Sequence, residues 1–271
     1  MTLSFVKMHA HGDDFVIIDR RGQADPITSK VARRLGDRHR GIGFNQLAVL
    51  LDCEDAAARV VFWNPDGSSL DTCGSATRGV ADTLMREAGT SSVLLRSKRG
   101  LLTCVREEGG AISVDMGKPS LAWQEVPLAE AMDTLALPIA GSPVACSMGN
   151  PHCTFFVEDI AAVDVAELGP RIETDPLFPN RTNVHFVQVI DRGRIRLRIW
   201  ERGAGIAQGS GSCCCGAVVG GIRRGLLDES VEVQCDGGTV RVRWDGRGGV
   251  ILSGQVEMVL QGTIAGHFLR D

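Results

Sequence analysis

Short apolar-rich runs of four to five residues fill much of the first 115 positions, and they are bounded by Gly, Pro, Asp or Asn. Runs of this length between turn-forming residues predict β-strands. The strands that we expect here cover residues 5–8, 15–19, 47–51, 60–63, 93–96, 101–105 and 112–115.

Two longer segments with a helical spacing of apolar residues interrupt these strands. Residues 29–38 place Val31 and Leu35 four positions apart, and residues 76–87 place Val80, Leu84 and Met85 on one side before Gly89. Apolar spacings of three or four residues, with a glycine as a stop, predict helices.

The same outline returns after a stretch over residues 116–142 that contains three prolines. The expected strands are 146–148, 153–157, 184–191 and 194–201, then a glycine-rich turn, a helix over 213–224 that ends at Gly225, and strands 231–234, 240–244 and 250–253. The helices over 76–87 and 213–224 carry little charge before their last turn, which favours helices enclosed by a sheet. We therefore expect an α+β protein with two lobes of similar plan and the site in the cleft between them.

Composition narrows the class of protein further. With 271 residues, 44% of them apolar, the chain is long enough to bury real cores. A net charge of −4 and the lack of tyrosine give no basic stripe or aromatic platform, so no nucleic-acid partner is expected. No run of about 18 apolar residues occurs and residues 1–7 have no long apolar core, so we expect a cytoplasmic protein that neither enters the membrane nor is secreted.

The cysteines do not form a disulfide or metal-binding pattern. There are nine, an odd number, three of them adjacent at 213–215, and no Cys-x-x-Cys pair occurs. Pro151-His152-Cys153 and the cysteine triplet offer only a loose set of metal ligands, so we expect no metal ion and no disulfide framework.

Two segments half a chain apart each place a nucleophilic side chain before a glycine and a hydroxyl, where a helix begins. They are Cys73-Gly74-Ser75 and Ser210-Gly211-Ser212. Free backbone N–H groups at a helix start hold an anion, and the helix dipole favours a thiolate over a thiol. The two segments are predicted to be two halves of one site. A serine hydroxyl has no appreciable anion near neutral pH, however, and needs its own base.

Three further motifs are candidates for the site, each with a structural alternative. Gly149-Asn150-Pro151-His152 fixes an amide and an imidazole on a short backbone, yet His152 can instead satisfy a loop carbonyl. Glu201-Arg202-Gly203 follows a strand, yet Glu201 can pair at the surface. Asn64-Pro65-Asp66-Gly67-Ser68 is also ordinary β-turn chemistry.

Taken in order over nearly the whole chain, these segments resemble the diaminopimelate epimerase family of cofactor-independent amino-acid epimerases. The resemblance is carried by residues 5–9, 15–19, 38–43, 63–68, 149–152 and 200–205. It implies two pseudo-symmetric lobes, each a curved and mostly antiparallel sheet wrapped around a central helix. The lobes would be residues 1–117 with a returning C-terminal strand over about 258–271, and residues 118–257. It also implies a homodimer, no cofactor and one amino-acid substrate bound between the lobes.

In this family, one cysteine from each lobe flanks the α-carbon of the substrate, and the two exchange the roles of base and acid. By the resemblance, Cys73 is the first of them and Ser210 stands at the position of the second, with His152 and Glu201 tuning the pair. The residues implied to contact substrate are Asp13, Gln46, Asn64, Gly74, Ser75, Asn150, Asn183, Glu201, Arg202, Gly211 and Ser212.

Several contact positions depart from the family. Besides Ser210, Asp13 and Ser75 replace asparagines, Asn45 replaces an aspartate, and Gly79 stands where a cysteine is common. An added carboxylate at Asp13 would repel the second carboxylate of diaminopimelate and favour a cationic or neutral end.

Three functions remain open from the sequence. The first is an epimerase of LL- and meso-diaminopimelate in lysine and cell-wall biosynthesis, slowed or inactivated on the Ser210 side unless Cys213 or Cys214 replaces the missing thiol. The second is a single-base homologue, namely a racemase of other specificity, a dehydratase or an eliminase. The third is a binding protein without turnover.

Overall fold

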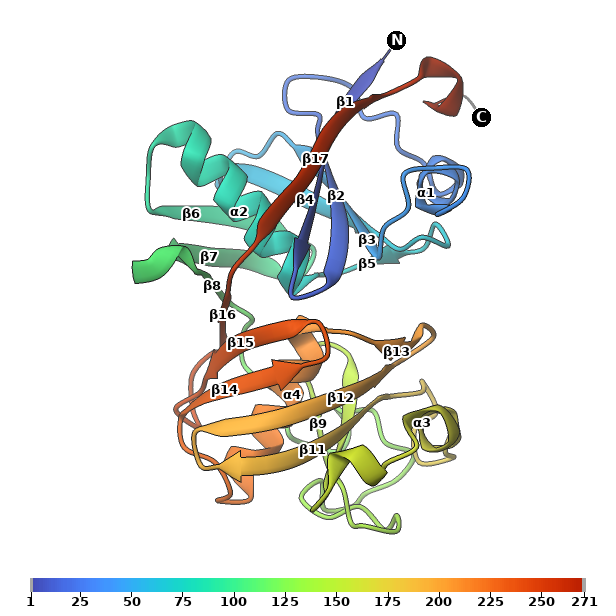
Figure 1. Cartoon of the computed structure of the whole chain (residues 1–271), viewed down its shortest axis with the longest axis vertical. Helices are drawn as coiled ribbons and strands as arrows, with labels where there is room; N and C mark the ends of the chain where they lie inside the picture. The colour runs from blue at the N-terminus through green and yellow to red at the C-terminus, as the bar shows by residue number, and fades with distance from the viewer. Residues whose placement is uncertain (1, 270–271) are drawn as a thin grey trace. The chain divides into compact units, whose positions relative to one another are not determined.

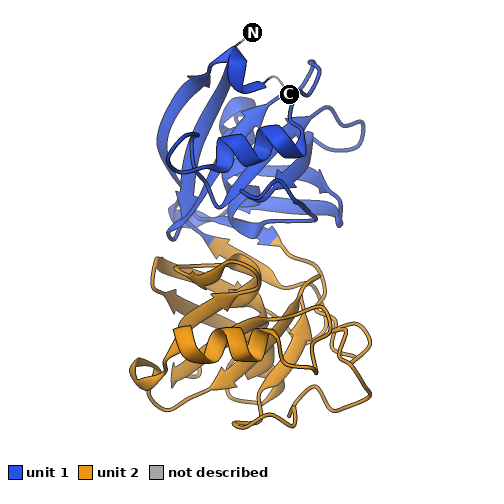
Figure 2. Cartoon of the chain, turned by 90° about the vertical axis from the view of Figure 1, so that its right-hand side faces the viewer, with its two compact units in different colours: residues 1–114, 254–271 blue, residues 115–253 orange. Residues whose placement is uncertain are grey.

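The computed structural model describes residues 2–269 and consists of two compact units (Figure 2). The first unit comprises the chain up to Val114 and from Gly254 on, and the second comprises Asp115–Ser253. The return strand expected over about 258–271 is β17 (Glu257–Ile264), followed by the 3₁₀ helix η3 (Gly266–Leu269). Residues 270–271 of that prediction lie outside the described residues.

The first unit contains one mixed sheet in the order β17-β1-β2-β3-β4-β6-β7-β8. The pairs β2–β3 and β4–β6 are parallel and the other pairs are antiparallel. The strands are β1 (Leu3–Ala10), β2 (Asp13–Asp19), β3 (Gln46–Leu51), β4 (Ala58–Trp63), β6 (Ser92–Ser97), β7 (Gly100–Arg106) and β8 (Ile112–Asp115), and the short β5 (Ser69–Leu70) pairs with β4.

The central helix of this unit is α2 (Gly74–Ala88), which packs against β1, β2, β3, β6 and β7. It is buried on nearly all sides from Gly74 to Met85, as its low charge predicts, and it ends where Gly89 adopts the left-handed conformation with φ 65°. Figure 1 shows α2 among the strands of the first unit. The first helical residues of α2, Gly74 and Ser75, are therefore buried, in a helix that packs against the sheet.

The second helix of the unit, α1 (Ser29–Gly36), is shorter than the predicted 29–38. Asp37 has extended backbone, with ψ 117°, and its carboxylate accepts the N–H groups of His39 and Arg40 at 2.8 and 3.0 Å. This Asx turn competes with the helix and redirects the chain. The η1 3₁₀ turn (Glu108–Gly110) lies between β7 and β8.

The second unit repeats this plan with the strand order β9-β10-β11-β12-β14-β15-β16. Counted from the last strand in each order, β8 or β16, the parallel pairs β12–β14 and β10–β11 occupy the same places as β4–β6 and β2–β3 of the first unit. The strands are β9 (Val144–Ser147), β10 (Pro151–Phe156), β11 (Asn183–Asp191), β12 (Arg194–Glu201), β14 (Ser230–Cys235), β15 (Gly238–Arg243) and β16 (Ile251–Gly254), and the short β13 (Gly205–Ala207) pairs with β12.

The central helix of the second unit is α4 (Gly211–Arg223), which packs against β9, β10, β11, β12 and β15. Helix α3 (Val165–Glu173), preceded by the 3₁₀ turn η2 (Ile160–Ala162), was not predicted, because Gly169-Pro170 indicates a turn. The predicted α+β fold, with two lobes of one plan around central helices, is confirmed. Among the described residues, no helix combines the length and apolar character that crossing a bilayer requires.

Candidate functional site

Cys73 stands at the start of α2 as its N-cap residue. Its sulfur accepts the N–H of Ala76 at 3.4 Å and donates to Gln46 Oε1 at 3.4 Å, and the side chain is partly exposed. Backbone N–H groups in the first turn of a helix have no partner within the helix and attract negative charge. The fold thus places Cys73 and the predicted contact residue Gln46 side by side at a helix start that favours an anion.

A buried polar cluster lies beside this helix start. A two-residue turn at His11 (φ 45°) and Gly12 (φ 82°) joins β1 to β2 and places Asp13 at the start of β2, where it is 6% exposed. Asn45 donates to Asp13 Oδ1 at 2.9 Å. Ser75 Oγ is buried near enough to favour the carboxylate, although it completes no hydrogen bond of ordinary geometry.

Burial raises the pKa of Asp13 to about 6, although Asn45, Ser75 and Arg78 each oppose the rise. Arg78, on α2, is fully buried, and one of its amino groups is 3.1 Å from His11 Nδ1. Burial, and next the Arg78 charge, lower the pKa of His11 to about 3, so His11 stays neutral and accepts from Arg78. Asp13, predicted as a substrate contact, is therefore held inside the protein by groups of the first unit.

Asn64 lies in the turn that its motif also predicted. Its N–H donates to Ser68 O at 2.8 Å, its carbonyl accepts from Gly67 at 3.0 Å, and its side-chain amide donates to Ser68 Oγ at 3.0 Å. The turn chemistry is real, and the amide is partly exposed at its edge. The turn and site interpretations of this motif are therefore compatible.

Ser210 stands at the start of α4, as Cys73 does at the start of α2. Its side chain caps no helical N–H; instead, Ser210 Oγ donates to Glu201 Oε1 at 3.0 Å. Glu201 ends β12, and β13 and the glycine-rich turn bring the chain back from Glu201 to Ser210. The immediate hydrogen-bond partner of the Ser210 hydroxyl is therefore a carboxylate, that of the predicted tuning residue Glu201.

A chain of hydrogen-bonding side chains runs from the α4 start into the core. Asn150 Nδ2 donates to Ser212 Oγ at 3.4 Å, and Asn150 Oδ1 lies 2.9 Å from His152 Nε2. His152 Nδ1 lies 3.2 Å from His185 Nε2, and His185 Nδ1 lies 3.1 Å from Thr154 Oγ1. Burial lowers the pKa of His185 to about 3, so this histidine is neutral. The contacts of His152 at both ring nitrogens are with the side chains of Asn150 and His185.

Asn183 fixes the backbone of the other second-unit motif. It donates from Nδ2 to Pro151 O at 3.0 Å and accepts at Oδ1 from the Arg202 N–H at 2.9 Å. The buried Glu173 accepts the Gly203 N–H at 3.0 Å and the Trp200 indole N–H at 2.6 Å. These contacts fix the backbone of the Glu201-Arg202-Gly203 turn. The nitrogen and the oxygen of the Asn183 side-chain amide each have a partner within the protein.

The two cysteines proposed as substitutes for the missing thiol are both fully buried. Burial raises the pKa of Cys213 well above its usual value, and the contact with Cys235, 3.5 Å away, together with burial does the same for Cys214. A buried, neutral thiol is a poor base. The Ser210 hydroxyl lies close enough to Cys213 to favour the thiolate form of that cysteine.

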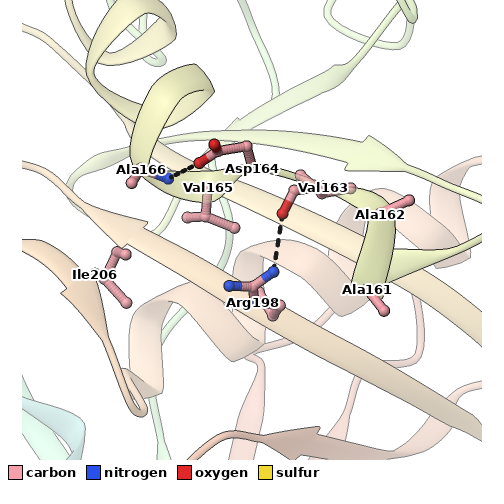
Figure 3. Close-up of a pocket in the computed structure, with 8 residues that line it drawn as sticks. All are labelled: Ala161, Ala162, Val163, Asp164, Val165, Ala166, Arg198 and Ile206. Atoms are coloured by element: carbon pink, nitrogen blue, oxygen red, sulfur yellow. Dashed lines mark hydrogen bonds between the residues drawn. The ribbon is translucent and has the colours of Figure 1, made fainter.

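An open pocket in the second unit contains none of the predicted site residues (Figure 3). Its polar groups serve the fold: Asp164 caps α3 through the Ala166 N–H at 3.1 Å, and Arg198 donates to Val163 O at 2.9 Å. Small apolar side chains complete its lining, namely those of Ala161, Ala162, Val165 and Ile206. This pocket lacks the chemistry of a catalytic site.

Within each unit, the structure therefore joins most of the predicted residues into local groups. Sequence reasoning missed His11, Arg78, Thr154, His185 and Glu173. A period of two was the available signal for two of them, because residues 152 and 154 of β10 face the same way and pair in parallel register with 183 and 185 of β11.

Comparisons with known proteins match one family over most of the chain. The sequence profile of the diaminopimelate epimerase family matches residues 5–122 and 144–259. Diaminopimelate epimerase of Acidiphilium cryptum is 42% identical over 264 residues, covering 96% of this chain and 95% of that protein. The enzyme of Gluconobacter oxydans is 44% identical over 267 residues, covering 98% and 100%.

Solved structures at low identity share the fold. A hydroxyproline epimerase from Agrobacterium vitis, with bound trans-4-hydroxy-L-proline, superimposes with a TM-score of 0.70 at 14% identity, covering 98% of this chain and 93% of that one. A phenazine biosynthesis protein of the PhzF family from Bacillus anthracis gives 0.71 at 18% identity, covering 98% and 99%. The family match over most of the chain and the relatives above 40% identity show that this chain belongs to the diaminopimelate epimerase family.

Proposed function

We propose that this protein is a cofactor-independent epimerase that inverts an α-carbon of diaminopimelate, in lysine and cell-wall biosynthesis. Cys73 carries the proposal, because a partly exposed sulfur at a helix start is the group that the family chemistry needs. The relatives named diaminopimelate epimerase, at 42% and 44% identity over nearly the full chain, support the choice of substrate.

On one face of the α-carbon, the Cys73 thiolate removes the proton. The negative charge that develops passes to the α-carboxylate, which the free N–H groups of Gly74 and Ser75 at the α2 start are proposed to bind. A helix start offers this stabilisation without a metal or cofactor. Gln46, 3.4 Å from the Cys73 sulfur, positions the thiol.

On the other face, Ser210 and Glu201 act together as donor and acceptor. When Ser210 Oγ takes the α-proton, its own proton passes to Glu201 Oε1, and in the opposite direction a protonated Glu201 reloads Ser210 as Ser210 gives its proton to the carbanion. The 3.0 Å hydrogen bond between them supports this relay. A hydroxyl is a weaker base than a thiolate, so we infer that inversion starting from the Ser210 side is the slower direction.

Asn64, Asn150 and Arg202 are proposed to hold the polar ends of the substrate, with Asn183 fixing the Arg202 backbone from behind. His152 orients Asn150 through the contact at 2.9 Å. The Asp13 carboxyl is proposed to influence the substrate site from its buried position, where Asn45 donates a hydrogen bond to it. By the same family resemblance, we propose a homodimer located in the cytoplasm; light scattering of the purified chain tests the dimer.

The serine at position 210, where the family has a thiol, favours a second candidate, a homologue with Cys73 as its single base. Such a homologue is either a racemase of other specificity or an enzyme in which Cys73 takes the α-proton and a β-substituent leaves. Such a reaction needs no second acid of matching strength.

One set of assays separates these functions. The purified chain is incubated in deuterated buffer with LL- and meso-diaminopimelate, and with a panel of other amino acids, while α-proton loss, inversion and loss of water are followed. We expect exchange and slow inversion of diaminopimelate. Inversion should be abolished by Cys73→Ser and faster in Ser210→Cys. Loss of water, or inversion of another amino acid alone, would support the single-base candidates. Thermal stabilisation without exchange would indicate a binding protein.

A further inference from the structure

Three side chains with metal-binding chemistry meet in the interior of the second unit. His152 lies on β10, His185 on β11 and Cys213 on α4, and none of the three is exposed to solvent. Their ligand atoms all lie within 4.8 Å of one another. Imidazole and thiolate are the ligands that zinc and related transition metals take in proteins. The fold thus assembles a ligand set that the loose spacing in the sequence did not predict.

The two imidazole rings stand at a spacing that suits one shared ion. His152 Nδ1 and His185 Nε2 are 3.2 Å apart. Two nitrogens bound tetrahedrally to zinc at ordinary bond lengths lie about 3.4 Å apart, and a zinc-bound sulfur lies about 3.6 Å from such nitrogens. The three ligand atoms lie up to 4.8 Å apart, so the longest of these separations has to shorten by about 1 Å for all three to bind one ion.

Both rings are also held from their outer sides. His152 Nε2 faces Asn150 Oδ1 at 2.9 Å, and His185 Nδ1 faces Thr154 Oγ1 at 3.1 Å. Outer partners of this kind fix the tautomer and orientation of metal-binding histidines. When both outer nitrogens donate, the two inner nitrogens each present a lone pair to the space that they share with the Cys213 sulfur. A cation satisfies both lone pairs at once.

The surroundings of Cys213 supply the remaining charge balance. The sulfur is fully buried, and the Glu201 carboxylate and the hydroxyls of Ser210 and Ser212 lie near it. A thiol that coordinates a divalent ion is deprotonated. A divalent ion with one thiolate leaves one net positive charge, and the Glu201 carboxylate offsets it.

We propose that His152, His185 and Cys213 bind one divalent transition-metal ion, zinc in particular, with a hydroxyl oxygen or a water molecule as fourth ligand. Binding forms one metal–sulfur bond and releases the Cys213 proton to solvent, and no oxidation or reduction takes place. Magnesium and calcium, which take oxygen ligands, do not compete. Since the ligands are buried, the ion enters during folding or through local opening. The proposal does not depend on the proposed reaction.

The test uses the full chain, refolded with zinc or cobalt(II) and then freed of unbound metal. Native mass spectrometry should count one ion per chain, and cobalt should give a near-ultraviolet band of sulfur-to-metal charge transfer. Because one proton is released, apparent affinity should rise about tenfold per pH unit. His185→Gln and Cys213→Ala should each weaken binding by at least about 100-fold.

Two matched controls should bind as the wild type does: His267→Gln, which removes an exposed histidine, and Cys214→Ala, which removes the neighbouring thiol that faces Cys235. Circular dichroism without metal identifies a variant that fails to fold, in which case the other ligand variant decides. A wild-type chain that retains no ion would overturn the proposal. So would a charge-transfer band that survives Cys213→Ala and disappears in Cys214→Ala, since it would assign the ion to the Cys214 and Cys235 thiols.

Discussion

Ser210 Oγ donates to Glu201 Oε1 over 3.0 Å, so the hydroxyl at the start of α4 has a carboxylate as its immediate partner. Replacing Glu201 by Gln keeps the shape and a hydrogen bond but removes the group that takes the proton. We expect inversion to fall by about 10² to 10⁴-fold, the usual contribution of general acid–base catalysis, while α-proton exchange from the Cys73 side persists. Chiral chromatography and proton NMR in deuterated buffer measure the two rates.

The control for this variant is Glu173→Gln, which changes a carboxylate of the same unit that binds Trp200 and Gly203. It should alter stability without changing the ratio of inversion to exchange. Equal losses of inversion and exchange in Glu201→Gln would show that Glu201 holds substrate and does not relay a proton.

Cys73 serves two purposes through one atom, because its sulfur is both the proposed base and the cap of α2 at 3.4 Å from the Ala76 N–H. Cys73→Ala and Cys73→Ser should both abolish α-proton exchange of the stereoisomer that Cys73 deprotonates, and with it inversion. Only Cys73→Ala should lower the free energy of unfolding, by about 1 kcal/mol, because the serine hydroxyl can still cap the helix. Urea unfolding beside the exchange assay distinguishes the two effects, and unchanged exchange of both stereoisomers in Cys73→Ala would remove Cys73 from the mechanism.

Asp13 should make the stability of the protein depend on pH in an unusual direction. Burial raises its folded-state pKa to about 6, above the 3.8 of an exposed carboxyl, so the native state binds the proton more tightly than the unfolded state. That stabilisation is fully present below pH 3.8 and is lost as pH rises through about 6. Between pH 4.5 and 7.5, the stability of Asp13→Asn relative to wild type should rise by about 2 kcal/mol, measured by urea unfolding.

Asp14→Asn is the matched control for this prediction. Although burial alone would raise it, hydrogen bonds from Arg38 and Lys7 hold the pKa of Asp14 below its usual value. Its stabilisation is lost only as pH falls through that lowered pKa, so no comparable rise should occur between pH 4.5 and 7.5. A pH-independent difference between Asp13→Asn and wild type would contradict the buried, proton-binding carboxyl.

Gly79 on α2 is required by the ring of Phe15. A Cβ atom at this position would lie 2.3 Å from Phe15 Cε2 and 2.4 Å from its Cζ. Although alanine favours helices over glycine by about 1 kcal/mol, Gly79→Ala should lower the free energy of unfolding by about 1 to 3 kcal/mol, because the core is overpacked. Adding Phe15→Leu should restore part of the loss.

Gly220→Ala in the other central helix is the control, since its nearest neighbour atom, Val144 Cγ1, is 3.4 Å from the added Cβ. Calorimetry of the four chains measures the effects. An unchanged stability in Gly79→Ala would mean that Phe15 moves aside freely.

The fold was predictable where apolar residues follow one period and turn residues mark the ends. Residues 15–19 and 76–87 are such segments, and the structure has β2 and α2 there. Helix α3 was not predicted from the sequence, because Gly169-Pro170 resembles a turn. Gly169 is instead required by the Trp200 ring, whose Cγ would lie 2.4 Å from a Cβ. The signal for α3 was Asp164 followed by Glu167, since Asp164 accepts two first-turn N–H groups.

The site was predictable only as far as single motifs reach. Cys73 and Ser210 stand at helix starts because a small-residue turn precedes each helix, which the sequence displays. The partners of these residues depend on how the strands pair. The period of two indicates that positions 183 and 185 share one face of a strand, but nothing local to position 185 indicates that this strand pairs with β10 and places His185 beside His152. Long-range pairing of this kind leaves no mark in a short window of sequence.

Serine at the N-cap position ordinarily stabilises a helix, because its hydroxyl accepts a backbone N–H that has no partner within the helix. Ser210 forgoes that gain of about 1 kcal/mol, since its oxygen is turned to Glu201 and caps nothing. Heat resistance and turnover therefore make opposite demands on this one residue. A library randomised at position 210 and sorted once for survival at high temperature and once for catalysis should diverge, and only the second sort should retain a side chain that reaches the carboxylate.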